Sequence, residues 1–360
     1  MGNIAHSALI QARHRLWKKP MQLLFSLLAK KWDDEQRKMA PLSTGFCGLS
    51  NYAVDGVVWS VPETKENALS FWRNGSTSAW PQIRAVCLVN TESRIVRDIA
   101  FWDYPNGELT YAKDLWSSAP DFSLTIFDRL YYSASLLINW NKDTREWERI
   151  ERHWLVRSRD TIRHEVLHTF WEWDVHVRLI TSPQAKKKDP SLPEYWEARL
   201  IEREIDGKTY KFLTSLMDAQ KYDASKIAAY YVERWEIELA YREVKQGLLE
   251  GELVLRSKLP ELIEQEVWGM FLAYESDSYG DGQYGPRSSY IPKTIELSRN
   301  IPLYCISTDS LANGNTCNIS RQTEVAQITS TVLYSSTQKT QKVSKSGQAT
   351  VMKVSYKKYQ

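Results

Sequence analysis

The chain has 360 residues, 42% of them hydrophobic and 25% charged, and its 47 Lys and Arg against 44 Asp and Glu give a formal net charge of +3. This composition is typical of a globular protein and excludes collagen-like, coiled-coil-only and wholly disordered chains, while the mildly basic balance suits nucleic acid without requiring it. Four scattered cysteines without CxxC pairing argue against a zinc ribbon or a disulfide framework, and no segment is apolar for long enough to span a membrane, so we expect a cytoplasmic protein.

The first third of the chain predicts a mixed α/β layout. Residues 4–38 have helical periodicity, with a break expected at Pro20. Short runs rich in β-branched and aromatic residues then predict strands at residues 52–59, 83–89, 95–102 and 124–127. Helical patterns predict helices at residues 108–116 and 129–140, on either side of the last of these strands. Alternation of strands and helices in this order is typical of α/β proteins.

The middle and end of the chain differ in composition. Residues 150–218 are again strand-rich, with a hairpin turn expected at Asp206-Gly207 and a polar loop at 186–188. Residues 224–273 are helical, with interruptions near Gly247, Gly251 and Pro260. All 15 tryptophans lie at or before Trp268, and the Ser-, Thr-, Asn- and Gln-rich segment 275–360 is predicted to be poorly ordered.

One helical segment carries an unusual set of polar side chains. Tyr231, Arg234, Glu238 and Lys245 have the spacing Y-x2-R-x3-E-x6-K. At about 100° per residue, the four side chains fall within an arc of about 60° on one helix face. Such a face could present a carboxylate to a metal while Arg and Lys meet phosphates. An ordinary helix with ion pairs four residues apart would have the same residues.

Two aspartates lie in apolar strands. Asp55 is inside one predicted strand and Asp128 directly follows another. A charged side chain in such a position is costly to bury unless it is paired, hydrogen-bonded or bound to metal. Together with Glu238, these residues make a three-carboxylate set that suits two Mg²⁺ or Mn²⁺ ions. Two ions about 3.5–4 Å apart can activate an attacking oxygen and stabilise a leaving oxygen in phosphodiester chemistry.

These motifs carry a family resemblance. Asp55 in VDGVVWSVPETKEN, Asp128 in LTIFDRLYYSASLL and the Y-x2-R-x3-E-x6-K helix resemble the DDE transposases of the insertion sequence 4 family. The similarity covers roughly residues 4–274, including ALIQARHRLW near the start and RSKLPELIEQEVWGMFLAY after the helix. Both Asp motifs precede the signature helix in the family's order.

The resemblance implies a fold and an activity. The fold is an α/β, ribonuclease H-like mixed sheet flanked by helices, with a β-rich insertion between the second Asp and the catalytic Glu. The activity is metal-dependent cleavage of DNA at transposon ends and transfer of the strands to target DNA. The implied catalytic residues and metal ligands are Asp55, Asp128 and Glu238, and those that bind transposon-end DNA are Tyr231, Arg234 and Lys245.

The resemblance also divides the chain and suggests further DNA contacts. We expect a helical N-terminal remnant at residues 1–50 and a tail at residues 275–360. Between them, the core would comprise residues 51–140 and 220–274, and the insertion that separates its two parts would be residues 141–219. A bacterial, DNA-associated protein that forms a homodimer in its DNA complex is implied. Tryptophans of the insertion region could stack a displaced base, whereas each could equally be a core residue: Trp147, Trp154 and Trp171.

The chain departs from the family pattern at its two ends. It begins almost at ALIQARHRLW, where family members have a further DNA-binding region, and the sequence changes sharply at Tyr274. These departures suggest truncation at the N-terminus and a frameshift near the C-terminus. The alternative hypothesis is therefore an inactive transposase-derived fragment that at most binds DNA.

A third reading comes from the segment His164-Glu165-Val166-Leu167-His168, which matches the zinc peptidase pattern H-E-x-x-H. The pattern binds zinc on a helix, but the surrounding residues alternate as in a strand. Strand positions four apart are separated by about 13 Å, too far for one zinc ion. We therefore expect no peptidase site here.

Overall fold

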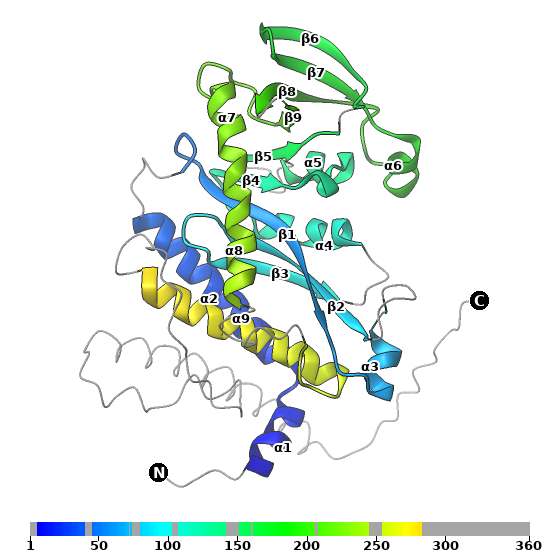
Figure 1. Cartoon of the computed structure of the whole chain (residues 1–360), viewed down its shortest axis with the longest axis vertical. Helices are drawn as coiled ribbons and strands as arrows, with labels where there is room; N and C mark the ends of the chain where they lie inside the picture. The colour runs from blue at the N-terminus through cyan, green and yellow to red at the C-terminus, as the bar shows by residue number, and fades with distance from the viewer. Residues whose placement is uncertain are drawn as a thin grey trace, which may run out of the picture.

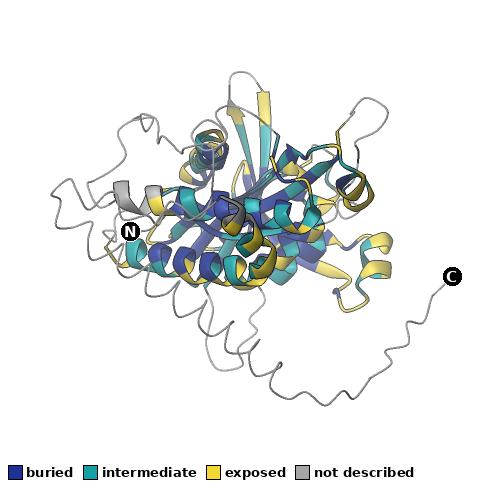
Figure 2. Ribbon diagram, turned by 90° about the horizontal axis from the view of Figure 1, so that it is seen from below, coloured by how far each residue is buried: buried dark blue, intermediate teal, exposed yellow. Residues whose placement is uncertain are grey.

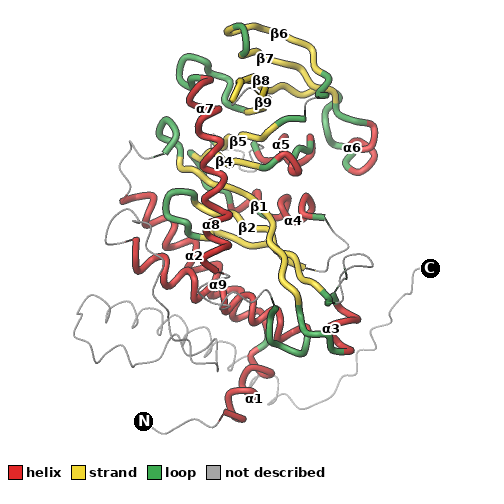
Figure 3. The backbone as a smooth tube through the Cα atoms, in the orientation of Figure 1, coloured by secondary structure: helices red, strands yellow, loops and turns green. Residues whose placement is uncertain are grey.

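The protein is described by a computed structural model, which covers residues 6–39, 45–71, 73, 80–102, 107–141, 151–159, 161–205, 208–244 and 254–282. Strands between Ser50 and Thr214 join one large mixed sheet with helices on its faces (Figure 1). None of the helices in these ranges is long and apolar enough to cross a membrane. Figure 3 shows how the helices, strands and loops are distributed.

Nine strands of the described residues lie in the order β3-β2-β1-β4-β5-β9-β8-β7-β6. β1 pairs antiparallel with β2 and parallel with β4, and β4 pairs parallel with β5. The remaining neighbours are antiparallel. The strands are β1 (Ser50–Ser60), β2 (Gln82–Asn90), β3 (Val96–Trp102), β4 (Ser123–Phe127), β5 (Arg152–Arg157), β6 (His164–Trp171), β7 (Asp174–Ile180), β8 (Tyr195–Ile205) and β9 (Lys208–Thr214).

Alternation along the strands assigns their side chains to two apolar layers. In β1, Ala53, Val57 and Trp59 enter one cluster, whereas Tyr52 and Val54 enter the other. This is the period of two that a strand buried on both faces requires. The first cluster also contains side chains of α2 (Lys18–Met39), α8 (Trp235–Glu243) and α9 (Pro260–Gly282), and the second contains those of α4 (Glu108–Asp114) and α5 (Ala134–Trp140). Figure 2 shows the buried residues gathered between these helices and the sheet.

The N-terminal helices agree with the sequence prediction except at their junction. The expected break at Pro20 is wrong, because α1 (His6–Leu16) ends before Trp17 and Pro20 lies in the first turn of α2. Trp17 has a φ of 59°, a left-handed conformation that stops a helix. A proline in the first turn removes an N–H that has no partner within the helix in any case.

The strands predicted before residue 130 are present, with ends within two residues of the expected ones. The sequence missed the short α3 (Lys65–Ser70), which begins where the side chain of Thr64 accepts a hydrogen bond from the Asn67 amide. The helix expected at 129–140 is divided into η2 (Arg129–Tyr131) and α5, and the one at 108–116 into α4 and η1 (Trp116–Ser118). These are changes of length and not of type.

The strand-rich region after β5 also follows the prediction. β8 ends at Ile205 and β9 begins at Lys208, on either side of the predicted Asp206-Gly207 turn, which lies outside the described residues. The loop expected at 186–188 is instead the end of a short helix, α6 (Pro183–Lys188), because Ser182 caps it and Pro183 occupies its first position.

The last described elements are helical. α7 (Ala224–Tyr230) and η3 (Tyr231–Arg234) lead into α8. α9 begins at Pro260 and continues through residue 282, beyond the change in composition at Tyr274. Residues 283–360, most of the segment predicted to be poorly ordered and out of frame, lie outside the described residues, and the predicted division into domains stays a prediction.

Candidate active site

The two strand-borne aspartates are brought together by the central parallel pair. In the register of β1 and β4, Val54 lies opposite Phe127. Asp55 is the next residue of β1, and Asp128 directly follows the end of β4. Since neighbouring strands lie about 4.8 Å apart, the two residues emerge side by side at the same end of the pair. The odd positions of β1 face α8, so Asp55 points to the helix that carries Glu238.

One arginine joins Asp55 to that helix. Arg234 Nη1 lies 3.3 Å from Asp55 Oδ2, and its Nη2 lies 2.8 Å from Glu238 Oε1. Asp128 is a further source of electrostatic attraction on the same guanidinium. Burial lowers the pKa of Arg234, but Tyr231 and the three carboxylates outweigh that effect and raise the pKa. Asp55 and Glu238 therefore contact one guanidinium, and Asp128 acts on it electrostatically.

The Asp55 carboxyl group lies in an environment that disfavours its charged form. The pKa of Asp55 is raised to about 6, mainly because burial removes water from the carboxylate and also because the carboxylates of Asp128 and Glu108 lie nearby. The Gly56 amide, which donates to Asp55 Oδ1 over 2.8 Å, and the guanidinium of Arg234 oppose this shift. The net effect is that the surroundings only partly compensate the negative charge of the Asp55 carboxylate.

Asp128 is fixed by its own backbone. It precedes η2, and its Oδ1 accepts a hydrogen bond of 2.6 Å from the Arg129 amide. Glu238 is more open, with 44% of its side chain exposed, against 22% for Asp55. Asp55 is thus half-buried, Asp128 caps a 3₁₀ turn and Glu238 is the most open of the three.

The signature residues do not lie on one regular α-helix. Tyr231 and Arg234 belong to the 3₁₀ segment η3 and Glu238 to α8, so the constant 100° spacing assumed for all four is wrong. The Tyr231 ring packs on Phe212 with centroids 5.1 Å apart, and its hydroxyl interacts with Arg234. Lys245 lies outside the described residues.

Sequence reasoning missed a fourth carboxylate beside the site. Glu108 begins α4 and approaches the Gly56 backbone so closely that a Cβ on Gly56 would lie 2.7 Å from the Glu108 carboxyl carbon. Tyr131 Oη donates to Glu108 Oε2 over 3.2 Å, and Arg84 Nε lies 3.4 Å from Oε1. The glycine directly after Asp55 was the available signal, since glycine in a strand often marks close approach of another group.

The donor set suits hard divalent cations, because all of its members offer oxygen. In the present side-chain arrangement, the described residues contain no group of three or more His, Cys, Asp or Glu poised to hold a metal ion. The Arg234 guanidinium lies between two of the carboxylates instead. The oxygen ligands and the negative charge of these carboxylates fit a divalent metal, provided that the Arg234 guanidinium moves away from Asp55 and Glu238.

The tryptophans predicted as base-stacking candidates have different environments. Trp154 is buried, with 2% of its surface exposed, and belongs to the second apolar cluster. Trp171 ends β6 and is 73% exposed. Trp147 lies outside the described residues. Only Trp171 of the two described tryptophans is accessible to a base.

The H-E-x-x-H segment lies on a strand, as the sequence predicted. His164 and His168 belong to β6, where His164 faces Leu179 and His168 faces His176 on β7. His168 stacks edge-on against Phe170, with ring centroids 5.0 Å apart. The two histidines therefore do not lie one turn apart on a helix, as zinc binding in a peptidase of this pattern requires.

Comparison with known proteins gives concordant similarities. A family model described as the transposase DDE domain matches residues 48–275. The chain is 38% identical over 279 residues to the transposase InsG for insertion sequence element IS4 of Escherichia coli (strain K12), covering 77% of this chain and 61% of that protein. It is 30% identical over 172 residues to the putative transposase InsZ of the same organism, covering 46% of this chain and 54% of that one.

A solved structure also resembles the chain. The piggyBac transposase synaptic complex with hairpin DNA matches with a TM-score of 0.39 and 8% identity, over 78% of this chain and 57% of that chain. A likeness of this size supports no structural conclusion. The chain spans about three fifths of the length of the IS4 relative.

Proposed function

The chain belongs to the DDE transposase family of insertion sequence 4 type, and from this premise we propose that it cleaves DNA at transposon ends and joins the freed 3′-hydroxyls to target DNA. In the first reaction, water attacks a phosphodiester and the bond to the 3′-oxygen breaks. In the second, that 3′-hydroxyl attacks a target phosphodiester and displaces a target 3′-oxygen. Both reactions are in-line displacements at phosphorus.

The observation that supports the proposal is that three carboxylates far apart in sequence all act on the guanidinium of Arg234. Asp55 and Asp128 directly follow the last paired positions of β1 and β4, and Glu238 on α8 contacts the same guanidinium as Asp55. The pKa of Asp55 is raised to about 6, first by burial and also by the carboxylates of Asp128 and Glu108, so its charged form is disfavoured without a further cation. A divalent cation would supply the missing charge.

Asp55, Asp128 and Glu238 would hold the metal, which we propose to be two Mg²⁺ or Mn²⁺ ions. When bound, such ions activate the attacking oxygen and stabilise the leaving oxygen. Glu238, the most exposed of the three, can reorient with little loss of packing. Asp55 and Asp128 are held by backbone amides and would keep their places.

Arg234, Tyr231 and Lys245 are proposed to bind the phosphates of the transposon end. Arg234 holds Asp55 and Glu238 with separate nitrogen atoms, and only 13% of its side chain is exposed. A DNA phosphate offers the same bidentate geometry as a carboxylate. Transfer of the guanidinium to a phosphate would release both carboxylates toward the metal, so the arrival of DNA and of metal would favour each other.

We assign the catalytic fold as ribonuclease H-like. The order β3-β2-β1-β4-β5, with three antiparallel and two parallel strands, supports this assignment. The core would comprise residues 51–140 and 220–274, and residues 141–219 would form the insertion. Action in the bacterial cytoplasm and assembly of a homodimer on DNA belong to the same proposal.

A cleavage assay with DNA that carries candidate transposon ends tests the proposal. We expect cutting that requires Mg²⁺ or Mn²⁺ and that falls to background in Asp55→Asn, Asp128→Asn and Glu238→Gln, with DNA binding retained. Glu236→Gln is the matched control, since Glu236 lies on the same helix but pairs with Arg94 at 2.7 Å. It should keep cleavage.

Two other outcomes would redirect the assignment. DNA binding without metal-dependent cutting would favour the inactive transposase-derived fragment. Cutting that survives all three carboxylate substitutions would place the chemistry elsewhere in the molecule.

A further inference from the structure

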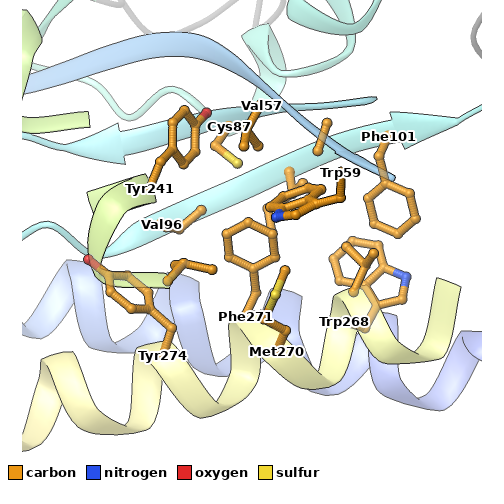
Figure 4. Close-up of a cluster of buried hydrophobic side chains, with 14 of the residues drawn as sticks. Val57, Trp59, Cys87, Val96, Phe101, Tyr241, Trp268, Met270, Phe271 and Tyr274 are labelled. Atoms are coloured by element: carbon orange, nitrogen blue, oxygen red, sulfur yellow. The ribbon is translucent and has the colours of Figure 1, made fainter. Parts of the chain in front are cut away.

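A single tyrosine connects the catalytic helix to the strand of the first aspartate. Tyr241 lies three residues after Glu238, about one turn along α8. Its hydroxyl donates a hydrogen bond of 2.6 Å to the backbone carbonyl of Asp55. The side chain is buried, with 6% exposed, and Figure 4 shows it pointing from the helix to the strands beside Cys87.

This contact occurs where the sheet gives β1 less support. β4 pairs with β1 only as far as the Val54–Phe127 position, whereas β2 continues opposite Asp55 through Cys87. The Tyr241 hydroxyl also interacts with the Cys87 thiol. The backbone of Asp55 is thus held by its β2 neighbour and by a side chain from α8.

The tyrosine is suited to fix a distance. Its ring belongs to the apolar cluster that includes Val57 and Phe271, so its position is set by packing. An aromatic side chain has two rotatable bonds and loses little conformational freedom when both ends are anchored. The bond to a backbone carbonyl does not use the carboxylate, and it would persist when Arg234 releases Asp55 and Glu238.

We propose that Tyr241 is a positioning residue, which holds Asp55 at the separation from Glu238 that metal binding requires. The inference rests on the proposed function, in which those two carboxylates are ligands. Outer-shell groups that orient metal ligands act in this way, and their loss typically lowers metal affinity or activity about 10- to 100-fold.

The experiment compares Tyr241→Phe with Tyr274→Phe in the full-length protein. Tyr274 is a matched control, because it belongs to the same apolar cluster and its hydroxyl lies within hydrogen-bond distance of two acceptors, the Arg94 backbone carbonyl at 3.1 Å and Glu243 Oε2 at 3.2 Å. Mn²⁺ binding is measured by electron paramagnetic resonance without DNA, at a temperature where circular dichroism shows each variant to be folded. Urea unfolding gives the stability of both.

We expect Tyr241→Phe to raise the dissociation constant for Mn²⁺ about 10-fold and Tyr274→Phe to leave it unchanged, with similar losses of stability. In the cleavage assay, Tyr241→Phe should lower the rate at saturating DNA and raise the Mn²⁺ concentration for half-maximal rate. The KM for DNA should not change. A merely structural hydroxyl would lower the urea midpoint without moving these values.

Unchanged Mn²⁺ affinity in Tyr241→Phe, or an equal loss in Tyr274→Phe, would overturn the positioning role while leaving the proposed function intact. If the wild-type protein binds no Mn²⁺ and cuts no DNA, the proposed function itself fails, and the positioning role fails with it. The wild-type measurement therefore separates the two failures.

Discussion

At the scale of single residues, the site is held in an arrangement that works against folding. Asp55 has a raised pKa because burial removes water from its carboxylate and other carboxylates lie close by. Arg234 relieves part of this repulsion, and in the proposed function it occupies the place of the metal. Residues chosen for binding a multivalent ligand commonly lower stability in its absence.

Replacement of this aspartate should stabilise the metal-free protein. A pKa raised from 3.8 to about 6 corresponds to roughly 3 kcal/mol, since a tenfold change in an equilibrium constant is about 1.4 kcal/mol. The folded state binds the proton more tightly than the unfolded state, so this penalty is absent below pH 3.8 and complete above about pH 6. In EDTA at pH 7.5, Asp55→Asn should therefore raise the free energy of unfolding.

Urea unfolding between pH 4 and pH 7.5 checks that expectation. The advantage of Asp55→Asn over the wild type should shrink as the pH falls through the range from about 6 to 3.8. An advantage that does not depend on pH would attribute the change to packing. Added Mn²⁺ should stabilise the wild type more than the variant, because only the wild type keeps the carboxylate.

Arg234→Gln should separate metal binding from DNA chemistry. Without the guanidinium between Asp55 and Glu238, we expect Mn²⁺ to bind more tightly in the absence of DNA, while cleavage of transposon-end DNA falls. Arg94→Gln is the control, because Arg94 pairs with Glu236 and Glu243 on the same helix. Addition of DNA should increase Mn²⁺ affinity in the wild type more than in Arg234→Gln. Equal increases would argue against exchange of the guanidinium.

The sequence was sufficient to single out the candidate carboxylates, but not what lies around them. Asp55 and Asp128 are recognisable because each is a charge in an apolar strand, a position that needs a physical reason. Arg234 on Asp55, and the approach of Glu108 to Gly56, depend on how helices cross the sheet. No local sequence pattern predicts how those helices cross the sheet, so these contacts around the site were found only in the three-dimensional structure.

At the scale of secondary structure, the β6–β7 hairpin is the least buried element of the sheet. β6 is the last strand in the sheet order, and none of its side chains is fully buried. The alternating pattern that identified it as a strand also excluded the zinc-binding helix. Trp171 at its end is 73% exposed and has no packing role to explain its size.

Trp171→Ala should weaken DNA binding without reducing stability. Stacking of a base on an aromatic side chain contributes about 1–3 kcal/mol, so we expect roughly a 5- to 150-fold loss of affinity for transposon-end DNA. Trp171→Phe keeps an aromatic face and should retain most of the affinity. Trp154→Ala should behave in the opposite way and destabilise folding by about 3–5 kcal/mol, because Trp154 is buried. Fluorescence anisotropy and urea unfolding measure the two effects, and unchanged affinity in Trp171→Ala would exclude the stacking role.

Local signals explain why element boundaries were harder to predict than element types. Trp17 adopts a left-handed conformation that usually favours glycine. Because a tryptophan is not a typical helix-ending residue, the sequence does not predict the helix end there. The 3₁₀ segment Tyr231–Arg234 also has no distinguishing sequence pattern, since 3₁₀ and α-helical turns accept the same residues. Types were predictable because burial on one or both faces imposes periodicity over many residues.

At the scale of the whole molecule, the N-terminal helix α2 is part of the core. Phe25 and Ala29 of α2 enter the same apolar cluster as Phe271 of α9 and the β1–β3 strands. Asp33 of α2 is fully buried, accepts hydrogen bonds from Tyr52 Oη at 2.6 Å and Asn90 Nδ2 at 2.8 Å, and pairs with Arg97. The segment expected to be a remnant therefore anchors the strands that carry the site.

Asp33→Ala should consequently destabilise the protein as a whole. The substitution leaves Arg97, 5% exposed, without its buried partner, and breaking a buried ion pair by removal of one charge costs about 3–5 kcal/mol. Asp34→Ala is the matched control on the same helix, because Asp34 contacts the same guanidinium at 2.7 Å but is 43% exposed. It should cost about 1 kcal/mol or less. Urea unfolding followed by circular dichroism and by Mn²⁺ binding should give coincident transitions for Asp33→Ala, since α2 and the strands of the site unfold together. Loss of helix α2 before loss of Mn²⁺ binding would instead show that the N-terminal helices fold as a separate unit.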